Sequence, residues 1–359
     1  MPKLTFKVLH EFVKAARLNL NQTHWDYLIG GTETETTLRR NRQAIEQRAL
    51  MPRVLNDVSE VSTSCTLLGC PLAMPVLLAP IGSLQVLDDA GGAGAALAAG
   101  EAGIMSFASS VCEPNLETIA GASGAAKVYQ LYVRGDETWV DDIIRRVIAS
   151  GYQGLCLTVD TAVLSRRERD IAKRVIPTSQ ASAGDFTFQA RLAWADVARI
   201  KRDFDLPLIL KGINHPDDAK RALDHGVEAI YVSNHGGRQL DHGLGTLDLL
   251  SDIKTVVGDQ AELIIDGGFY RGSDILKALA LGANAVGLGR LQGWALAAGG
   301  PDALVSCLNI LRLELIEALA LCGLSDVGDV HPDLVRPATP VSDASIFSAF
   351  PLLSFDEGY

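Results

Sequence analysis

The sequence lacks any uninterrupted apolar run of the roughly 18 to 20 residues that a helix needs to cross a bilayer, so we expect no transmembrane segment. It also lacks an excess of positive charge, because 43 acidic residues outweigh 32 Lys and Arg and the formal net charge is -11. Nucleic acids and anionic membranes attract cationic surfaces, so neither is an expected partner. Residues 1–19 have no secretory apolar core or cleavage site and predict an amphipathic helix packed on the domain.

Cysteine is scarce and unpatterned. The six cysteines form no C-x-x-C pair and show no Cys/His spacing of a zinc site, so we predict no metal. We interpret them as reduced, mostly buried thiols of a cytoplasmic protein. The glycine-rich residues 90–103 do not match G-x-G-x-x-G and follow two aspartates rather than a strand. A Rossmann nucleotide site is therefore not expected there.

What the chain does contain is a repeated alternation of apolar runs and helical segments. Most of the runs begin about 23 to 33 residues apart, which suits a strand, a loop, a three-turn helix and another loop. This repeat predicts a (β/α)8 TIM barrel of the α/β class. The eight expected strands are residues 75–81, 104–110, 127–133, 155–160, 206–212, 229–235, 262–268 and 285–290.

We expect one domain over residues 1–359, in three parts. Residues 1–70 have helical patterns, including one at 33–50, residues 75–325 form the barrel, and the proline-containing residues 331–359 form an extended tail. The gap between residues 160 and 206 is the longest, and it predicts a lid loop after the fourth strand. Its Ser/Ala/Gly/Gln stretch at 178–184 indicates a mobile part of that lid.

The stretch 232–241 places a histidine and an arginine directly after a predicted strand. His235 titrates near neutral pH, and the planar fork of Arg238 suits a carboxylate or a phosphate. Alone, such a histidine is more often structural. In this barrel, however, catalytic side chains lie at the carboxyl ends of several strands. The polar residues at those ends are Gln130, Tyr132, Thr158, Asp160, Lys211, Ser233, His235, Asp266, Gly289 and Arg290.

Two glycine-containing strand ends predict a phosphorylated cofactor. Gly267 and Gly268 follow the seventh strand, and Gly289 and Arg290 follow the eighth, where such barrels commonly bind phosphate. Lys211 would place a positive charge where negative charge develops on a cofactor ring. A structural ion pair or a Schiff-base role for this lysine remains an alternative interpretation.

Several sequence motifs over roughly positions 20–325 resemble those of a known family. The motifs are 52–58 (PRVLNDV), 130–132 (QLY), 158–161 (TVDT), 166–170 (RRERD), 210–213 (LKGI), 233–241 (SNHGGRQLD), 266–268 (DGG) and 277–282. They are similar to those of the FMN-dependent α-hydroxy acid oxidases and dehydrogenases, the group of glycolate oxidase, lactate oxidase and mandelate dehydrogenase. The 233–241 block is the most specific of these signatures.

The resemblance implies FMN-dependent oxidation of a small (S)-2-hydroxy acid to the 2-oxo acid. O2 is the expected electron acceptor, with another acceptor as the alternative, and a cytoplasmic homo-oligomer, a tetramer, is implied. The resemblance also implies that His235 is the catalytic base, oriented by Asp160, with Tyr132 at the substrate hydroxyl. The implied substrate-binding residues are Tyr27, Tyr132, Arg167 and Arg238. The implied FMN-binding residues are Pro80, Ile81, Gly82, Ser109, Gln130, Thr158, Lys211, Ser233, Asp266, Gly267, Gly268, Arg271, Gly289 and Arg290.

The chain departs from the family pattern at several positions. Tyr270 stands where the family usually has an arginine that resembles a phosphate ligand, and we expect Arg271 to substitute for it. Ile81, Gly82 and Ala108 replace a common threonine, alanine and serine near the flavin. The lid loop after the fourth strand is also shortened relative to the family pattern. These departures leave two other hypotheses open: a non-redox lyase or isomerase that uses Lys211, and a family member that binds flavin or a partner without turnover.

Overall fold

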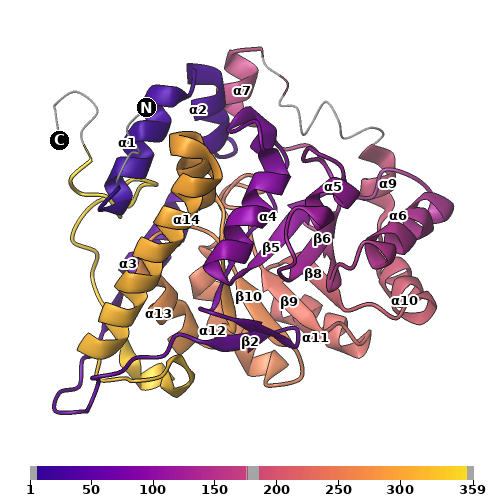
Figure 1. Cartoon of the computed structure of the whole chain (residues 1–359). Helices are drawn as coiled ribbons and strands as arrows, with labels where there is room; N and C mark the ends of the chain where they lie inside the picture. The colour runs from indigo at the N-terminus through magenta and orange to yellow at the C-terminus, as the bar shows by residue number, and fades with distance from the viewer. Residues whose placement is uncertain (1–5, 175, 177–185, 354–359) are drawn as a thin grey trace.

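The computed structural model describes residues 6–174, 176 and 186–353, and its centre is a closed parallel barrel (Figure 1). The strands follow the order β10-β11-β4-β5-β6-β7-β8-β9 around the ring. The predicted (β/α)8 fold is confirmed, because each of the eight predicted runs overlaps one of the barrel strands. Their bounds are β4 (Val76–Leu78), β5 (Met105–Ser109), β6 (Lys127–Leu131), β7 (Gly154–Thr158), β8 (Leu208–Ile213), β9 (Ala229–Val232), β10 (Glu262–Ile265) and β11 (Ala285–Leu288).

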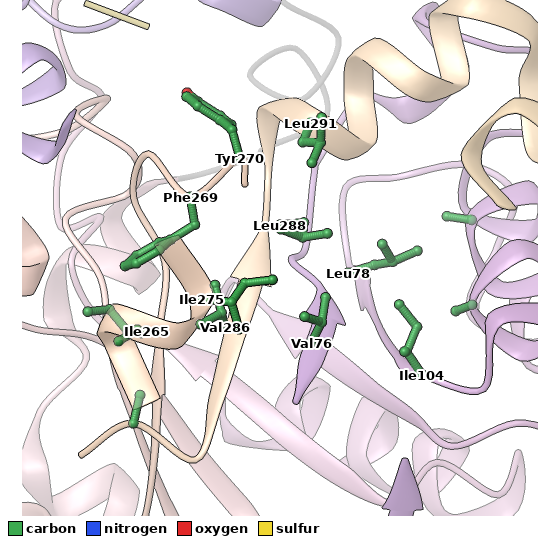
Figure 2. Close-up of a cluster of buried hydrophobic side chains, with 14 of the residues drawn as sticks. Val76, Leu78, Ile104, Ile265, Phe269, Tyr270, Ile275, Val286, Leu288 and Leu291 are labelled. Atoms are coloured by element: carbon green, nitrogen blue, oxygen red, sulfur yellow. The ribbon is translucent and has the colours of Figure 1, made fainter. Parts of the chain in front are cut away.

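Helices surround this ring and cover the outward-facing side chains of the strands. Those that follow or precede barrel strands are α4 (Gly91–Ala102), α5 (Leu116–Gly121), α6 (Glu137–Ala149), α10 (Trp194–Asp203), α11 (Pro216–Asp224), α12 (Thr246–Val257), α13 (Gly272–Ala280) and α14 (Arg290–Leu321). Figure 2 shows part of the layer between them, where side chains of β4 and β11 meet those of α13 and α14. Since both faces of the strands are buried, their sequences are continuous apolar runs rather than alternating ones.

A second apolar cluster fills the inside of the barrel. Leu77, Phe107, Tyr231 and Ile264 are among its fully or nearly fully buried members. The hairpin of β2 (Cys65–Leu67) and β3 (Cys70–Leu72) adds Leu67 and Leu72 to the same cluster. The barrel is therefore a packed core with its polar strand ends at one mouth, rather than a pore.

The N-terminal segment differs in part from its predicted pattern. Three helices are present, α1 (Leu9–Asn19), α2 (Gln22–Ile29) and α3 (Thr36–Glu46), and α1 lies along α14 (Figure 1). The expected helix over 33–50 ends at Glu46, because residues 48–50 form β1 (Arg48–Leu50), which pairs antiparallel with β12 (Val335–Pro337). The tail is therefore joined to the N-terminal segment by backbone hydrogen bonds.

The segment after β7 contains α7 (Glu168–Ala172) and α9 (Phe186–Arg191). The predicted mobile stretch at 178–184 lies outside the described residues. No helix in the described part of the chain is both long enough and apolar enough to span a membrane. All six cysteines are unpaired thiols.

Candidate active site

A cleft opens at the carboxyl ends of the barrel strands, with an empty volume, open solvent at its mouth included, of about 1230 Å³. Fourteen of the twenty predicted site residues line it. They are Tyr27, Pro80, Ile81, Gly82, Tyr132, Arg167, Lys211, His235, Arg238, Asp266, Gly267, Gly268, Gly289 and Arg290. The strand order thus brings residues more than 200 positions apart in sequence to one mouth.

His235 lies between a carboxylate and a phenol. Its Nδ1 is 3.1 Å from Oδ1 of Asp160, and its Nε2 is 3.2 Å from the Tyr132 hydroxyl. The His235 backbone has φ +59°, a left-handed conformation that is unusual for a non-glycine residue, and its N–H donates to Ser233 Oγ. Asp160 can approach closely because residue 212 is glycine: a Cβ there would be 2.6 Å from the Asp160 Cγ.

The buried surroundings of His235 favour a neutral imidazole. Burial lowers the pKa of His235, and Lys211 lowers it further, although Asp160 opposes both. Burial alone would raise the pKa of Asp160, but His235 and Lys211 hold it below its usual value. Since Asp160 accepts from Nδ1–H, the free lone pair of a neutral imidazole is on Nε2, which faces the cleft side of the ring.

Lys211 forms the buried cationic floor of the cleft. Its ammonium donates to Ser233 Oγ at 2.9 Å and lies 3.5 Å from Asp266 Oδ2. Ser233 Oγ in turn donates to Asp266 Oδ1 at 2.7 Å. Burial opposes the charge, but Asp266 and Asp160 raise the pKa of Lys211, so the side chain is an ammonium ion at neutral pH.

Four predicted residues stand behind the cleft lining and support it. Gln130 Nε2 donates to Thr158 Oγ1 at 2.8 Å, and Ser109 Oγ donates to Gln130 Oε1 at 2.7 Å. Ser233 connects Lys211 to the His235 backbone, as described above. These side chains are buried and hydrogen-bonded, so they fix the floor as a polar network on adjacent strands.

The guanidinium groups of Arg167 and Arg238 line the cleft, and the buried carboxyl group of Asp170 lies near both of them. Arg238 stacks over the Tyr27 ring at 4.9 Å, and burial together with the charge of Arg167 lowers its pKa to about 9. The buried Nε of Arg167 has no hydrogen-bond partner in the described structure. An unpartnered buried Nε, together with two guanidinium groups close enough for one to lower the pKa of the other, indicates a site for an added anion.

One expectation is corrected at the glycine end of the cleft, which is formed by Gly267, Gly268 and Gly289: Arg271 does not take the place of the arginine that Tyr270 replaces. Tyr270 is buried there, with its hydroxyl pointing away from the aliphatic cluster (Figure 2), and burial raises its pKa. Arg271 does not reach the cleft. Its guanidinium makes a two-pronged ion pair with Glu314 and donates to the Ala349 carbonyl, so it does not substitute for the missing arginine.

Several lining residues were not predicted from the sequence. Gln189 on α9 donates to the Thr158 carbonyl at 2.8 Å and accepts from the Val133 N–H at 2.7 Å. It comes from the long segment after β7, where no periodic signal distinguished a site residue from a loop residue. The other unpredicted side chains are mainly apolar: Leu28, Val111, Val133, Leu164, Phe186 and Phe269.

The cleft fits FMN on observations of its own residues. Gly267 and Gly268, at φ +107° and +88°, bring bare backbone to one end, and a Cβ built on Gly289 would meet open space. The buried Nε of Arg290 in the same region has no partner in the described structure, which suits an anionic group.

Comparisons with known proteins agree with this geometry. A family model described as FMN-dependent dehydrogenase matches residues 16–337. An L-lactate oxidase from Nostoc sp. is 38% identical over 355 residues, which cover 91% of this chain and 97% of that protein. The structure of a mandelate oxidase variant with 2-hydroxy-phenylacetamide has a TM-score of 0.88 and 36% identity, covering 94% of this chain and all of that one.

A second mandelate oxidase structure, with a C4a-OH-FMN adduct, has a TM-score of 0.85 and 35% identity and covers 92% of this chain and 99% of that one. The predicted family, fold and FMN cofactor are thereby confirmed. With its barrel, its polar strand ends and a match over most of its length, the chain belongs to the FMN-dependent α-hydroxy acid oxidase and dehydrogenase family.

Proposed function

We propose that the protein oxidises a small (S)-2-hydroxy acid to the 2-oxo acid and passes the electrons to O2. The observation that carries the proposal is the arrangement of His235. Its Nε2 faces the Tyr132 hydroxyl, its Nδ1 faces Asp160, and the guanidinium groups of Arg167 and Arg238 line the same cleft. A neutral base beside an anion clamp is what deprotonation of a hydroxy acid requires.

The substrate carboxylate would bind Arg167 and Arg238, with Tyr27 beside Arg238. Tyr132 remains a phenol because burial and Asp160 raise its pKa, so its O–H can donate to the substrate oxygen. His235 then takes a proton on Nε2: the hydroxyl proton if the α-hydrogen leaves as a hydride, or the α-proton itself on a carbanion route. Asp160 stabilises the imidazolium that forms in either case.

FMN, when bound, supplies the two-electron acceptor that O2 reoxidises. On the protein side, Lys211 holds a positive charge on the floor of the cleft and donates to Ser233. Gln130 lies behind the lining, where it donates to Thr158, and residues 80–82 line the cleft. We assign Asp266 to the ribityl chain, and Gly267, Gly268, Gly289 and Arg290 to the phosphate. A buried fixed ammonium ion stabilises negative charge that develops nearby.

The position of Lys211 argues against the lyase or isomerase alternative. A Schiff-base lysine must lose its proton to attack a carbonyl group. Here Asp266 and Asp160 raise the pKa of Lys211, and its ammonium already donates to Ser233. The charge is therefore stabilised rather than removed.

Anaerobic mixing of the FMN-loaded protein with glycolate, lactate and mandelate tests the proposed reaction. We expect at least one acid to bleach the oxidised flavin absorbance, and air to restore it with formation of H2O2. No bleaching with any of the acids would contradict the oxidation of small 2-hydroxy acids. Bleaching that air does not reverse would leave the first half-reaction intact and point to a dehydrogenase with another acceptor.

Arg238→Lys tests the clamp separately. Lysine keeps the charge but replaces a bidentate fork with a point charge, so KM should rise about tenfold or more. An unchanged KM would contradict the assignment of Arg238 to the substrate carboxylate.

We also propose a cytoplasmic homo-oligomer, a tetramer, on the strength of the family resemblance. Sedimentation velocity on the FMN-loaded protein tests the assembly, and a single species at the 38.3 kDa mass of one chain would contradict it.

A further inference from the structure

The turn between α2 and α3, residues 30–35, connects two arginines that line the cleft, Arg238 and Arg290. Arg238 donates from Nη1 to the carbonyls of Tyr27 at 2.7 Å and Gly30 at 2.8 Å. Arg290 donates from Nη2 to the same Gly30 carbonyl, also at 2.8 Å. One peptide oxygen therefore receives two guanidinium groups, one from the loop after β9 and one from the start of α14.

The shared carbonyl determines which donors of Arg238 remain for a ligand. Because Nη1 makes both protein hydrogen bonds, the Nε and Nη2 edge is left without a partner in the described structure. That edge is the one with two parallel N–H groups, the geometry that binds a carboxylate bidentately. A displaced Gly30 oxygen would release the guanidinium to rotate.

Glu35 holds the peptide group that carries this oxygen. The Gly31 N–H donates to Glu35 Oε1 at 3.0 Å, and that N–H belongs to the same planar peptide unit as the Gly30 carbonyl. In a trans peptide the N–H and C=O point in opposite directions. A carboxylate on the N–H therefore aims the oxygen at the two arginines and polarises it toward them.

Glu35 is itself held in place. Arg169 on α7 donates to both of its oxygens, at 2.6 and 2.8 Å, and the Glu35 backbone has φ +58° with its N–H on the Thr32 carbonyl. The turn also packs too closely for side chains: a Cβ on Gly30 would be 2.7 Å from the Asp26 carbonyl, and one on Gly31 would be 2.9 Å from the Gly237 carbonyl. A residue in a strained conformation with this many partners has a defined position.

We propose that Glu35 is a positioning residue of the carboxylate clamp: through the Gly30–Gly31 peptide it fixes Arg238 so that its remaining Nε and Nη2 donors face the cleft. The proposal rests on the proposed function, since it names how the anion site of that reaction is held. Glu35 touches neither substrate nor cofactor, so it should act on binding rather than on the chemical step.

The test compares Glu35→Ala and Glu35→Gln with the parent as FMN-loaded proteins. The probe is oxalate, a non-reacting carboxylate whose dissociation constant is read from the change in flavin absorbance. For Glu35→Ala we expect this constant, and the KM of a turned-over hydroxy acid, to rise about tenfold or more, with kcat within about threefold of the parent. The oxalate dissociation constant of Glu35→Gln should lie between those of the parent and Glu35→Ala, because the carboxamide oxygen can still accept from Gly31 but carries no charge.

Glu33→Gln is the matched control, since it removes one negative charge from the same turn at an exposed side chain. It should leave the oxalate dissociation constant unchanged. A merely structural role for Glu35 would lower kcat together with thermal stability and would not separate KM from kcat. If the parent binds oxalate and Glu35→Ala binds it equally well, the positioning role is wrong; if the parent binds no oxalate, the proposed function is wrong as well.

Discussion

His235 is held by its backbone as much as by its ring. The left-handed φ of +59° costs on the order of 1 kcal/mol or more in a non-glycine residue, so surrounding contacts must fix it. Ser233 Oγ accepts its N–H, and the side chains of Asn234 and Asn41 hydrogen-bond each other reciprocally at 2.7 and 3.0 Å just beside it. The ring is thus aimed before any ligand arrives, which is the condition for efficient proton transfer.

His235→Gln removes the titrating nitrogen while keeping a polar side chain of similar reach. We expect the rate of flavin reduction to fall by roughly 10²- to 10⁴-fold, the usual contribution of a positioned base. FMN should still bind, because His235 is not among the residues that we assign to the cofactor. Stopped-flow absorbance measures the reduction, and a rate near that of the parent would refute the assignment of the base.

The pH dependence of kcat/KM reports the same residue. Only the neutral imidazole can accept a proton, so activity is present above the pKa of His235 and is lost as the pH falls through it. Burial lowers this pKa from its ordinary value of 6.5, so we expect the acid limb of the profile to lie below pH 6.5. A midpoint above 6.5 would mean that Asp160 outweighs burial and Lys211.

The site residues that could be found without the family resemblance share one property: they lie at or just beyond the carboxyl end of a buried strand. That position selects Tyr132, Asp160, Lys211 and His235, and the closed barrel brings them together. Gln189 could not be found in this way because it lies on a short helix within a connection. Arg271 was misjudged because its partner Glu314 is supplied by tertiary contact with α14, which no local pattern reveals.

Among the elements, α3 depends on a carboxylate from a distant loop. Glu35, the residue just before the helix, provides no side-chain cap, and Asp241 from the loop after β9 supplies one instead. Asp241 accepts from the backbone N–H of Thr37 at 2.8 Å and from the N–H of Thr34 at 2.9 Å. The helix that supports the Gly30–Glu35 turn is therefore tied to the same loop that carries His235.

Asp241→Asn should lower the free energy of unfolding by about 1 to 3 kcal/mol at pH 7, because charge-assisted bonds to buried N–H groups are lost. Burial opposes ionisation, but hydrogen bonds from Thr34 and Thr37 hold the pKa of Asp241 well below its usual value. A lowered pKa gives stability that is present above the unfolded-state value near 3.9 and is lost as the pH falls toward the folded-state value.

Chemical denaturation of the parent and Asp241→Asn at several pH values measures that difference. It should be full at pH 7 and shrink below about pH 4. Asp343→Asn, at an exposed position, is the control and should change little at any pH. A difference that grows on acidification would contradict the capping role.

The C-terminal segment is a second element whose role comes from tertiary contact. Phe350 is 2% exposed and packs edge-on against Trp294. It also makes a tilted ring contact with Tyr270, which lines the cleft. Sequence reasoning predicted only an extended tail, and it could not place β12 against β1 because their pairing joins residues about 290 positions apart. Prolines within a segment indicate where it bends but not what it touches.

Phe350→Ala should therefore lower the free energy of unfolding by about 3 to 5 kcal/mol, the usual cost of emptying a buried phenylalanine site. Leu352→Ala, two residues on and 55% exposed, removes apolar atoms from the same segment and should cost less than about 1 kcal/mol. Equal and small effects would mean that the tail contributes little to the core around Tyr270.

At the scale of the whole molecule, an acidic protein carries a locally cationic cleft. The net charge of -11 resides mainly on the surface, while Lys211, Arg167, Arg238 and Arg290 gather at the strand ends. Salt screens interactions between exposed charges beyond about 8 to 10 Å, but it screens buried ones much less. The local cations therefore decide what binds in the cleft, and an anion that neutralises them should stabilise the entire fold.

FMN removal and replacement tests that coupling. A ligand that binds only the folded state stabilises it by about 2.7 kcal/mol at a concentration 100 times its Kd, so FMN should raise the unfolding midpoint of the apoprotein by several degrees. Riboflavin has the same ring without the phosphate and should give a smaller rise at equal concentration. The difference measures what Gly267, Gly268, Gly289 and Arg290 contribute, since Arg271 is paired with Glu314 instead. Equal shifts for the two flavins would contradict the assignment of the glycine end to phosphate, because an anion that neutralises a buried cation must add stability that a neutral ligand does not.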